Sequence, residues 1–236
     1  MNRQKQFKKN DRMGDLICSH SELIPVLSRF NIPLGFGDKS VKEVCESNQI
    51  DCDTFLSVAN FLVDENIDST ESISKISLRN LILFLTNAHS YFHEYKFPII
   101  RNKLDEIISK DEPAILQLVL NFFDKYVLEV MKHMNYEEKV VFGYVDELLA
   151  GEITNNYSIG TFKDRHNEID SKLADLKNML IKYIPVAKGE NNRLSDVLID
   201  IFNCEKELEM HTRIEDFLFI PAIAKLEKEL SQYGSK

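Results

Sequence analysis

The chain has 236 residues, enough for a buried core, with 44% hydrophobic residues and a formal net charge of −9 at pH 7. Basic residues cluster only near the start of the chain, so a surface for nucleic acid is not expected. No stretch reaches the roughly 18 uncharged apolar residues of a membrane span, and no apolar run near the start predicts a signal peptide.

The first part of the chain is predicted to hold a small helical N-terminal module. Residues 1–12 are polar and basic and are expected to form a disordered tail, and residues 13–68 are expected to form the module. Helices are predicted within it over residues 16–30, 40–48 and 53–65. About 55 residues in short helices make a marginal independent domain, so the module is expected to pack on the rest of the chain.

Two of these helices carry start signals. Ser40 and Glu43 have the spacing of a capping box, in which each side chain satisfies a backbone N–H near the other residue. Asp51 or Asp53 can cap the following helix.

The remainder of the chain is predicted to be a helical bundle. Residues 69–77 form a polar linker, and residues 78–232 hold long helices over 78–109, 113–149, 158–184 and 192–232. Pro98 should kink the first helix one or two turns after His89, and Pro221 should bend the fourth. Because the connections are short, the sequence predicts an all-α protein with an up-down-up-down four-helix bundle after the N-terminal domain.

Each bundle helix carries a histidine on its apolar face. Apolar residues recur at steps of three and four, as they do on the buried side of a bundle helix. The histidines in these series are His89, His133, His166 and His211. Glu137 and Glu215 follow His133 and His211 by four residues, so each pair shares one face of its helix. The six side chains are therefore predicted to face one core.

Such a core needs positive charge. Burying a carboxylate without a partner costs several kcal/mol, and two carboxylates among four imidazoles are best compensated by cations. Facing helices of a bundle are a known place for dinuclear sites. Imidazole and carboxylate donors without a thiolate favour iron, although imidazole also accepts zinc or copper. A hydrogen-bonded core without metal is the alternative reading.

At these residues the sequence resembles the hemerythrin-like HHE cation-binding domain. The resemblance rests on His133-x-x-x-Glu137 followed by Glu138, on His166, and on His211-x-x-x-Glu215 before the aromatic segment 217–221. It implies two iron ions, oxo- or hydroxo-bridged. The implied terminal ligands are His89, His133, His166 and His211, and the implied bridging carboxylates are Glu137 and Glu215.

The first bundle helix offers two histidines. His93 lies four residues after His89 and on the same face of the helix. We favour His89 as the ligand because it is in register with the centre of the other three series. His93 remains the alternative.

From Met13 to about Glu229 the chain is also similar to the iron–sulfur cluster repair di-iron proteins, which carry a small module before such a bundle. Those proteins have a Cys-Cys pair followed by glycine in the module, whereas this chain has Gly35 and Phe36 at those positions. The other cysteines of the module lie on separate predicted helices without metal-ligand spacing and are expected to be packing residues: Cys18, Cys45 and Cys52.

The similarity implies a di-iron protein of the repair and nitrosative or oxidative stress response type. It would bind O2 or NO, or supply iron to iron–sulfur proteins. The missing cysteine pair favours the alternative, which is reversible O2 or NO binding or sensing without repair activity. Free thiols fit a reducing compartment, so the protein is expected to be cytoplasmic. Neither nucleic acid nor a membrane is an expected partner, and a homodimer is left open.

Overall fold

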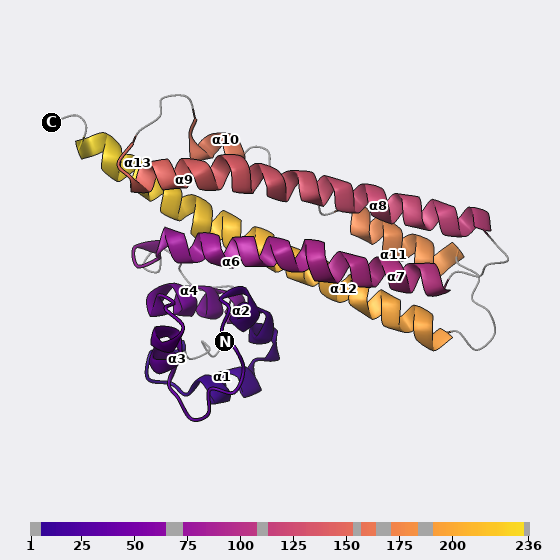
Figure 1. Ribbon diagram of the computed structural model, residues 1–236, viewed down its shortest axis with the longest axis horizontal. Coiled ribbons are helices and arrows are strands. Elements are labelled where there is room, and N and C mark those ends of the chain that lie inside the picture. The colour runs from indigo at the N-terminus through magenta and orange to yellow at the C-terminus, as the bar shows by residue number, and fades with distance from the viewer. Residues whose placement is uncertain are drawn as a thin grey trace. The chain divides into compact units, whose positions relative to one another are not determined.

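The computed structural model describes residues 6–64, 73–107, 113–152, 157–163, 171–183 and 191–233. Within these ranges the secondary structure is helical, and the isolated β-bridge between Arg12 and Ser40 is its one strand-like pairing (Figure 1). The predicted all-α fold class is confirmed.

The chain divides into two compact units. The first comprises residues 1–88, 144–159 and 212–236, and the second comprises residues 89–143 and 160–211. The first therefore holds the N-terminal module, and the second holds most of the candidate metal ligands.

The module consists of short helices whose ends are set by local signals. These are α1 (Met13–Ser19), η1 (Ser21–Leu23), α2 (Ile24–Arg29), α3 (Val41–Ser47) and α4 (Cys52–Val63). The predicted helix over 16–30 is interrupted at His20, whose backbone leaves the helical region. The capping box of Ser40 and Glu43 is confirmed. Asp51 caps α4 by accepting from the Thr54 N–H at 2.8 Å.

The segment before α1 differs from the expected disordered tail. The N–H of Val41 donates to the Asp11 carbonyl at 2.9 Å, and the N–H of Phe7 donates to Oδ1 of Asn60 at 2.7 Å. Polar composition does not reveal such backbone partners, and the bounds of the tail remain a prediction. Residues 1–5 lie outside the described ranges.

Within the first unit the module packs against the start of α6 (Leu78–Tyr91). The ring of Phe30 lies 5.0 Å from the ring of Phe84, and both side chains are buried. The Asn87 side chain donates to the carbonyl of Arg29 at 2.7 Å. These contacts cover an apolar face of α6, as expected for a module too small to be stable alone.

The predicted linker, residues 69–77, is described only from residue 73 onward. Its last residue, Ser77, donates its N–H to Oγ1 of Thr54 at 2.8 Å, which ties the start of α6 to α4. The bounds predicted for the module and the linker remain predictions.

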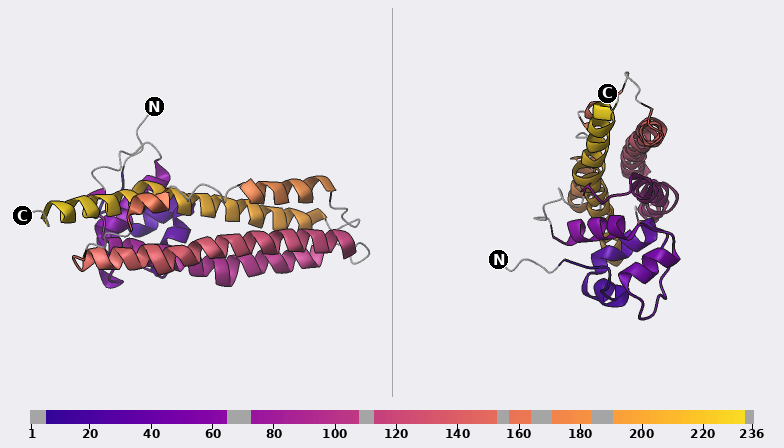
Figure 2. Two further views of the ribbon diagram at one scale, coloured as in Figure 1. Left: turned by 90° about the horizontal axis from the view of Figure 1, so that it is seen from above. Right: turned by 90° about the vertical axis from the view of Figure 1, so that its left-hand side faces the viewer.

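In the second unit, α6 continues from His89 into further helices. These are the π-helical turn η2 (Phe92–Lys96), α7 (Phe97–Ile107), α8 (Pro113–Tyr136), the π-helical turn η3 (Glu137–Val141), α11 (Ser171–Tyr183) and α12 (Asn191–Ile214). Figures 1 and 2 show α7, α8, α11 and α12 lengthwise beside one another, with the chain direction alternating along the sequence. This is the arrangement expected from short connections.

The remaining elements are α9 (Phe142–Leu149), α10 (Ile159–Lys163), the π-helical turn η5 (Glu215–Phe219) and α13 (Ile220–Tyr233). Residues 160–163 of α10 belong to the second unit, and the other three elements belong mainly to the first. The third bundle helix, predicted over 158–184, is described only as α10 and α11, because residues 164–170 lie outside the described ranges.

Each π-helical turn lies beside a candidate ligand. Turn η3 begins at Glu137, η5 begins at Glu215, and η2 begins three residues after His89. Where the sequence predicted a kink and a bend, Pro98 and Pro221 each lie two residues after such a turn. Proline removes one i→i−4 hydrogen bond, which favours a change of helical register, and π-helical turns are frequent at functional sites.

A partly buried ion network joins η2 and α7 to α12 within the second unit. The ammonium of Lys96 lies 2.9 Å from Asp200, and Lys103 donates to the other oxygen of Asp200 at 2.6 Å. Burial alone would raise the pKa of Asp200, but the hydrogen bonds from Lys103 and Lys96 outweigh it and hold the pKa below the ordinary value of 3.8. The network therefore fixes how α12 packs against the first bundle helix.

The module cysteines, expected to be packing residues, differ from one another in burial. Cys18 is exposed, whereas Cys45 is buried and Cys52 is half-buried. A hydrogen bond from the Cys45 thiol to Cys52 raises the pKa of Cys45, which burial raises further, and lowers the pKa of Cys52. Separate helices thus bring two of the thiols together, which spacing along the sequence did not suggest.

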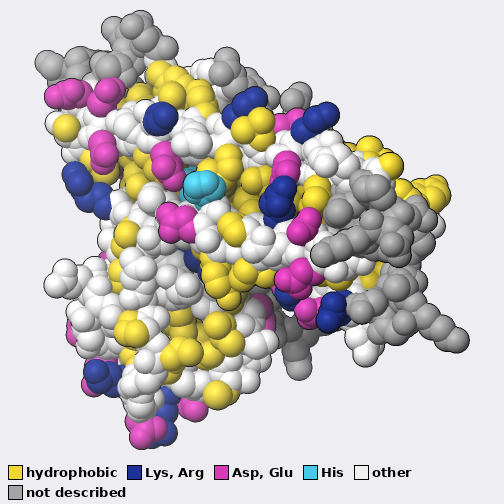
Figure 3. Space-filling model, turned by 45° about the vertical axis from the view of Figure 1, so that its right-hand side comes forward, with side chains coloured by type: hydrophobic (Ala, Val, Ile, Leu, Met, Phe, Trp, Pro, Cys, Tyr) yellow, Lys and Arg dark blue, Asp and Glu magenta, His cyan; other side chains and the backbone are white. Residues whose placement is uncertain are grey.

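In the described part of the chain, no helix is long and apolar enough to cross a membrane. The face drawn in Figure 3 carries acidic and basic side chains interspersed with hydrophobic ones. On that face the acidic residues that set the net charge are mixed with basic ones.

Candidate metal centre

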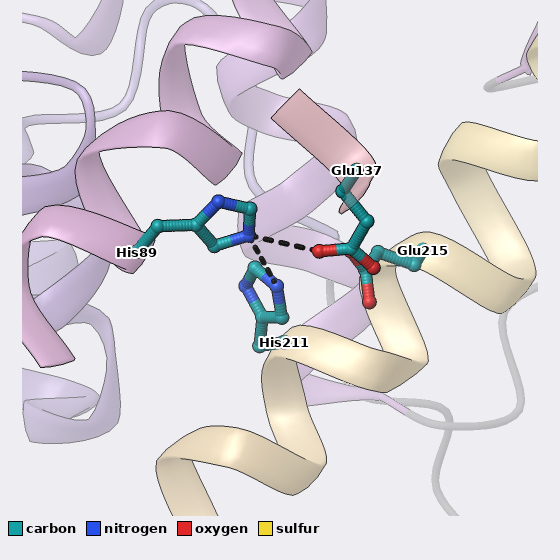
Figure 4. Close-up of side chains that lie close together, drawn as sticks. All are labelled: His89, Glu137, His211 and Glu215. Carbon is teal, nitrogen blue, oxygen red and sulfur yellow. Dashed lines mark hydrogen bonds and ion pairs between the residues drawn. The ribbon is translucent and has the colours of Figure 1, made fainter. Parts of the chain in front are cut away.

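Four side chains of the types that ligate metals converge in the described residues (Figure 4). They are His89, Glu137, His211 and Glu215, and one ligand atom from each lies within 4.8 Å of those of the others. All four are buried, and the two carboxylates are 0% and 1% exposed. Charged groups are rarely buried this deeply unless they are paired or coordinate a metal.

His89 is the point at which the group meets. Its Nε2 lies 3.1 Å from Oε2 of Glu137 and 3.2 Å from Nε2 of His211, the two contacts dashed in Figure 4. Nε2 of His89, on the first bundle helix, thus faces a potential metal-binding atom of Glu137 from η3 and another of His211 from α12.

Glu137 stands between two imidazoles. Its Oε2 faces His89, and its Oε1 lies 2.8 Å from Nε2 of His133, one helical turn earlier on α8. The ring of His133 stacks on Phe162 at a centroid distance of 6.2 Å, and its side chain is 20% exposed. The i, i+4 spacing placed His133 and Glu137 on one face, as the sequence predicted.

Aromatic rings pack against His89 and His211, the two histidines of the buried group. His89 stacks on Phe142 with an interplanar angle of 9°, and the rings of His211 and Phe92 form a T-shaped pair with an interplanar angle of 84°. Apolar walls lower the local dielectric constant, so they strengthen every interaction between charges inside the group.

The donor set fits a divalent metal such as iron. Two buried carboxylates and three imidazoles within contact distance provide oxygen and nitrogen donors and no thiolate, a combination that suits iron. A cation would also compensate the cost of burying Glu137 and Glu215.

Most of the predicted ligands are described by the structure. His89, Glu137, His211 and Glu215 form the group, and His133 contacts it through Glu137. His166 lies outside the described ranges. The six-residue ligand set therefore stays a prediction.

His93, the alternative ligand on the first helix, is exposed and is not among the four converging residues. It instead lines a partly open cavity of about 530 Å³, together with Glu94, Met131 and Glu138. His89 also lines this cavity, so the same imidazole borders both the cavity and the buried group.

Glu138 is a residue of the site whose role sequence reasoning missed. Its Oε1 lies 2.9 Å from Nδ1 of His89, on the side of the ring away from Glu137. A second glutamate directly after Glu137 was the available signal. The regular repeat of 3.6 residues per turn could not predict that the Glu138 side chain points toward His89, because the π-helical turn η3 changes the helical register at that point.

The comparison with protein families agrees with this geometry. The family model described as the hemerythrin HHE cation-binding domain matches residues 80–223, a span that contains all six predicted ligands. A comparison with curated proteins gave no match. Because the family model covers more than half of the chain, the protein belongs to the hemerythrin HHE cation-binding family.

Proposed function

We propose that this chain is a non-haem di-iron protein with a His4Glu2 site, of the type that acts in iron–sulfur cluster repair and in the response to nitrosative and oxidative stress. The proposed ligands are His89, His133, Glu137, His166, His211 and Glu215. The observation that carries the proposal is the convergence of His89, Glu137, His211 and Glu215 in a buried group of a chain that belongs to a cation-binding family.

The contacts of Glu137 support a pair of ions rather than a single one. Its two oxygens face different imidazoles, with Oε2 toward His89 and Oε1 toward His133. Glu137 would therefore be suited to hold two ions, with His89 and His133 each supplying an imidazole. Glu215 would be the second carboxylate that holds them, one turn after His211 on the same continuous helical run.

Two ferrous ions at this site would supply electrons and open coordination positions for O2 or NO. The chain's own residues hold the donors and limit access of water. Phe142 and Phe92 pack against His89 and His211, and the cavity beside His89 is a route of approach from the surface. Iron–sulfur proteins are the proposed partners for iron supply, and the cytoplasm is the proposed location.

Single-turnover spectroscopy tests this proposal. The reduced, iron-loaded protein is mixed with NO, and released nitrous oxide is measured together with the absorption of the iron site. Release of nitrous oxide supports a redox function. Glu137→Gln is the control, because it keeps the shape of the side chain and removes the charge proposed to hold the metal.

A second function is favoured by the module. Gly35 and Phe36 stand where the repair proteins carry their cysteine pair, so the thiolates that could pass iron are absent from those positions. Gly35 has a positive φ of 93°, which glycine adopts easily and other residues rarely do. A protein that binds NO or O2 reversibly, without nitrous oxide or iron transfer to an apo iron–sulfur protein, would fit this alternative role in storage or sensing.

A further inference from the structure

Both ring nitrogens of His89 have defined partners. The Nε2 atom faces the buried group, whereas Nδ1 lies 2.9 Å from Oε1 of Glu138. The ring is also stacked on Phe142. The side chain of His89 is 3% exposed and that of Glu138 is 39% exposed, so the pair spans from the buried group to the cavity.

The contact with Glu138 bears on which nitrogen of His89 is available to a metal. A carboxylate oxygen accepts hydrogen bonds, so Nδ1 donates to Glu138, while Nε2 faces Oε2 of Glu137 at 3.1 Å. A metal at the buried group would take the lone pair of Nε2 and displace any proton there. The hydrogen bond to Glu138 then keeps the remaining proton of the neutral imidazole on Nδ1.

We propose that Glu138 is a positioning residue for the metal centre, which acts through His89 from the wall of the cavity. It fixes the tautomer and the ring orientation of His89, and as an anion it increases electron donation from the imidazole. Metal-binding histidines commonly have such a carboxylate partner, whose loss weakens metal binding about 10–100-fold. The inference rests on the proposed function, because Glu138 would tune the same metal centre that the proposed function uses.

The electron donation has a direction that can be measured. A negatively charged partner on Nδ1 favours the more highly charged ferric state over the ferrous state. Removing the charge should therefore shift the reduction potential of the iron centre to more positive values. A residue that only supported the local packing would not move the potential in a charge-dependent order.

Three variants test the role of Glu138. Glu138→Gln keeps the size and one acceptor oxygen but removes the charge, and Glu138→Ala removes both. Glu94→Gln is the matched control, because it removes a carboxylate from the wall of the same cavity. The affinities for ferrous iron and for Co²⁺ are measured by competition with a chelator, and the reduction potential is measured by a spectroscopic titration.

We expect metal affinity to fall in the order wild type, Glu138→Gln, Glu138→Ala, with a total loss of about 10–100-fold and a positive shift of the potential in both variants. Glu94→Gln should stay within about twofold of the wild type, since this side chain has no assigned role at the centre. Circular dichroism of the metal-free variants checks that they fold. If Glu138→Ala does not fold, Glu138→Gln decides.

Wild-type affinity and an unchanged potential in Glu138→Gln and Glu138→Ala would overturn the inference while leaving the proposed function intact. An equal loss in Glu94→Gln would also overturn it, since the effect would then belong to the charge of the cavity as a whole. If the wild type takes up Co²⁺ but no iron, the di-iron function fails, and the Co²⁺ affinities still decide the role of Glu138. If the wild type binds neither metal, both proposals fail.

Discussion

The Nε2 atom of His89 lies 3.1 Å from Oε2 of Glu137, and the two side chains are 3% and 1% exposed. This contact joins the first bundle helix to the π-helical turn η3 at a position that water scarcely reaches. A buried imidazole and carboxylate so arranged provide a nitrogen and an oxygen donor to the same point.

The two histidines of the first bundle helix should differ in their effect on metal content. His89→Ala removes a buried donor that contacts both Glu137 and His211, so it should lower the metal bound per chain sharply. His93→Ala changes an exposed side chain and should leave the metal content near that of the wild type. Elemental analysis of the two purified variants makes the comparison. The opposite order would identify His93 as the ligand.

The two neighbouring thiols of the module should react at different rates. The pKa of Cys52 is lowered by the hydrogen bond from Cys45, and Cys52 is also the more exposed of the two. Because the thiolate is the reactive form, Cys52 should be alkylated by iodoacetamide well before Cys45 in the native protein at pH 7.5.

Mass spectrometry of peptides from briefly treated protein follows both sites. The variant Cys45→Ser keeps a hydroxyl donor beside Cys52, whereas Cys45→Ala removes the donor. Slower alkylation of Cys52 in Cys45→Ala than in Cys45→Ser would support the assigned hydrogen bond. Equal rates of Cys45 and Cys52 in the wild type would contradict it.

The ion network on α12 should make stability depend on acid pH. Because Asp200 has a lowered pKa in the folded protein, its stabilising contribution is complete above the ordinary value of 3.8 and is lost as the pH falls through the folded value. Asp200→Asn should therefore cost about 2 kcal/mol at pH 7, and this difference from the wild type should shrink below pH 3.8.

Urea unfolding of both proteins between pH 7 and pH 3 measures the difference. Asp196→Asn is the matched control, because Asp196 binds the same Lys103 but its side chain is 64% exposed. Exposed ion pairs contribute at most about 1 kcal/mol, so this control should have the smaller effect. An equal cost for the two variants, or a difference that grows on acidification, would contradict the assignment.

The helical periodicity of the sequence predicted which side chains face the inside of the bundle. Helical repeats of three and four residues placed His89, His211, Glu137 and Glu215 on inward faces, and the structure brings these side chains together. The all-α class followed from the same repeats and from the caps, including that of Ser40 with Glu43. Features that depend on one local rule recurring along a helix could therefore be derived without coordinates.

Other features depend on contacts that no local rule describes. The direction of Glu138 depends on the π-helical turn η3, where the normal repeat fails. The pairing of Cys45 with Cys52 depends on how two short helices pack, and the order of residues 6–12 depends on backbone partners supplied by α3 and α4. These features depend on tertiary contacts between separate elements, so composition and spacing along the sequence did not reveal them.

Iron content is the most direct test of the central claim, which is that the buried histidine and glutamate side chains hold two iron ions. Protein expressed in iron-replete cells should contain about two irons per chain, as in the dinuclear sites known in helical bundles. The variants Glu137→Gln and Glu215→Gln should lose most of that iron and the thermal stabilisation that bound metal gives. Elemental analysis that finds mainly zinc, no metal, or unchanged iron in both variants would contradict the claim.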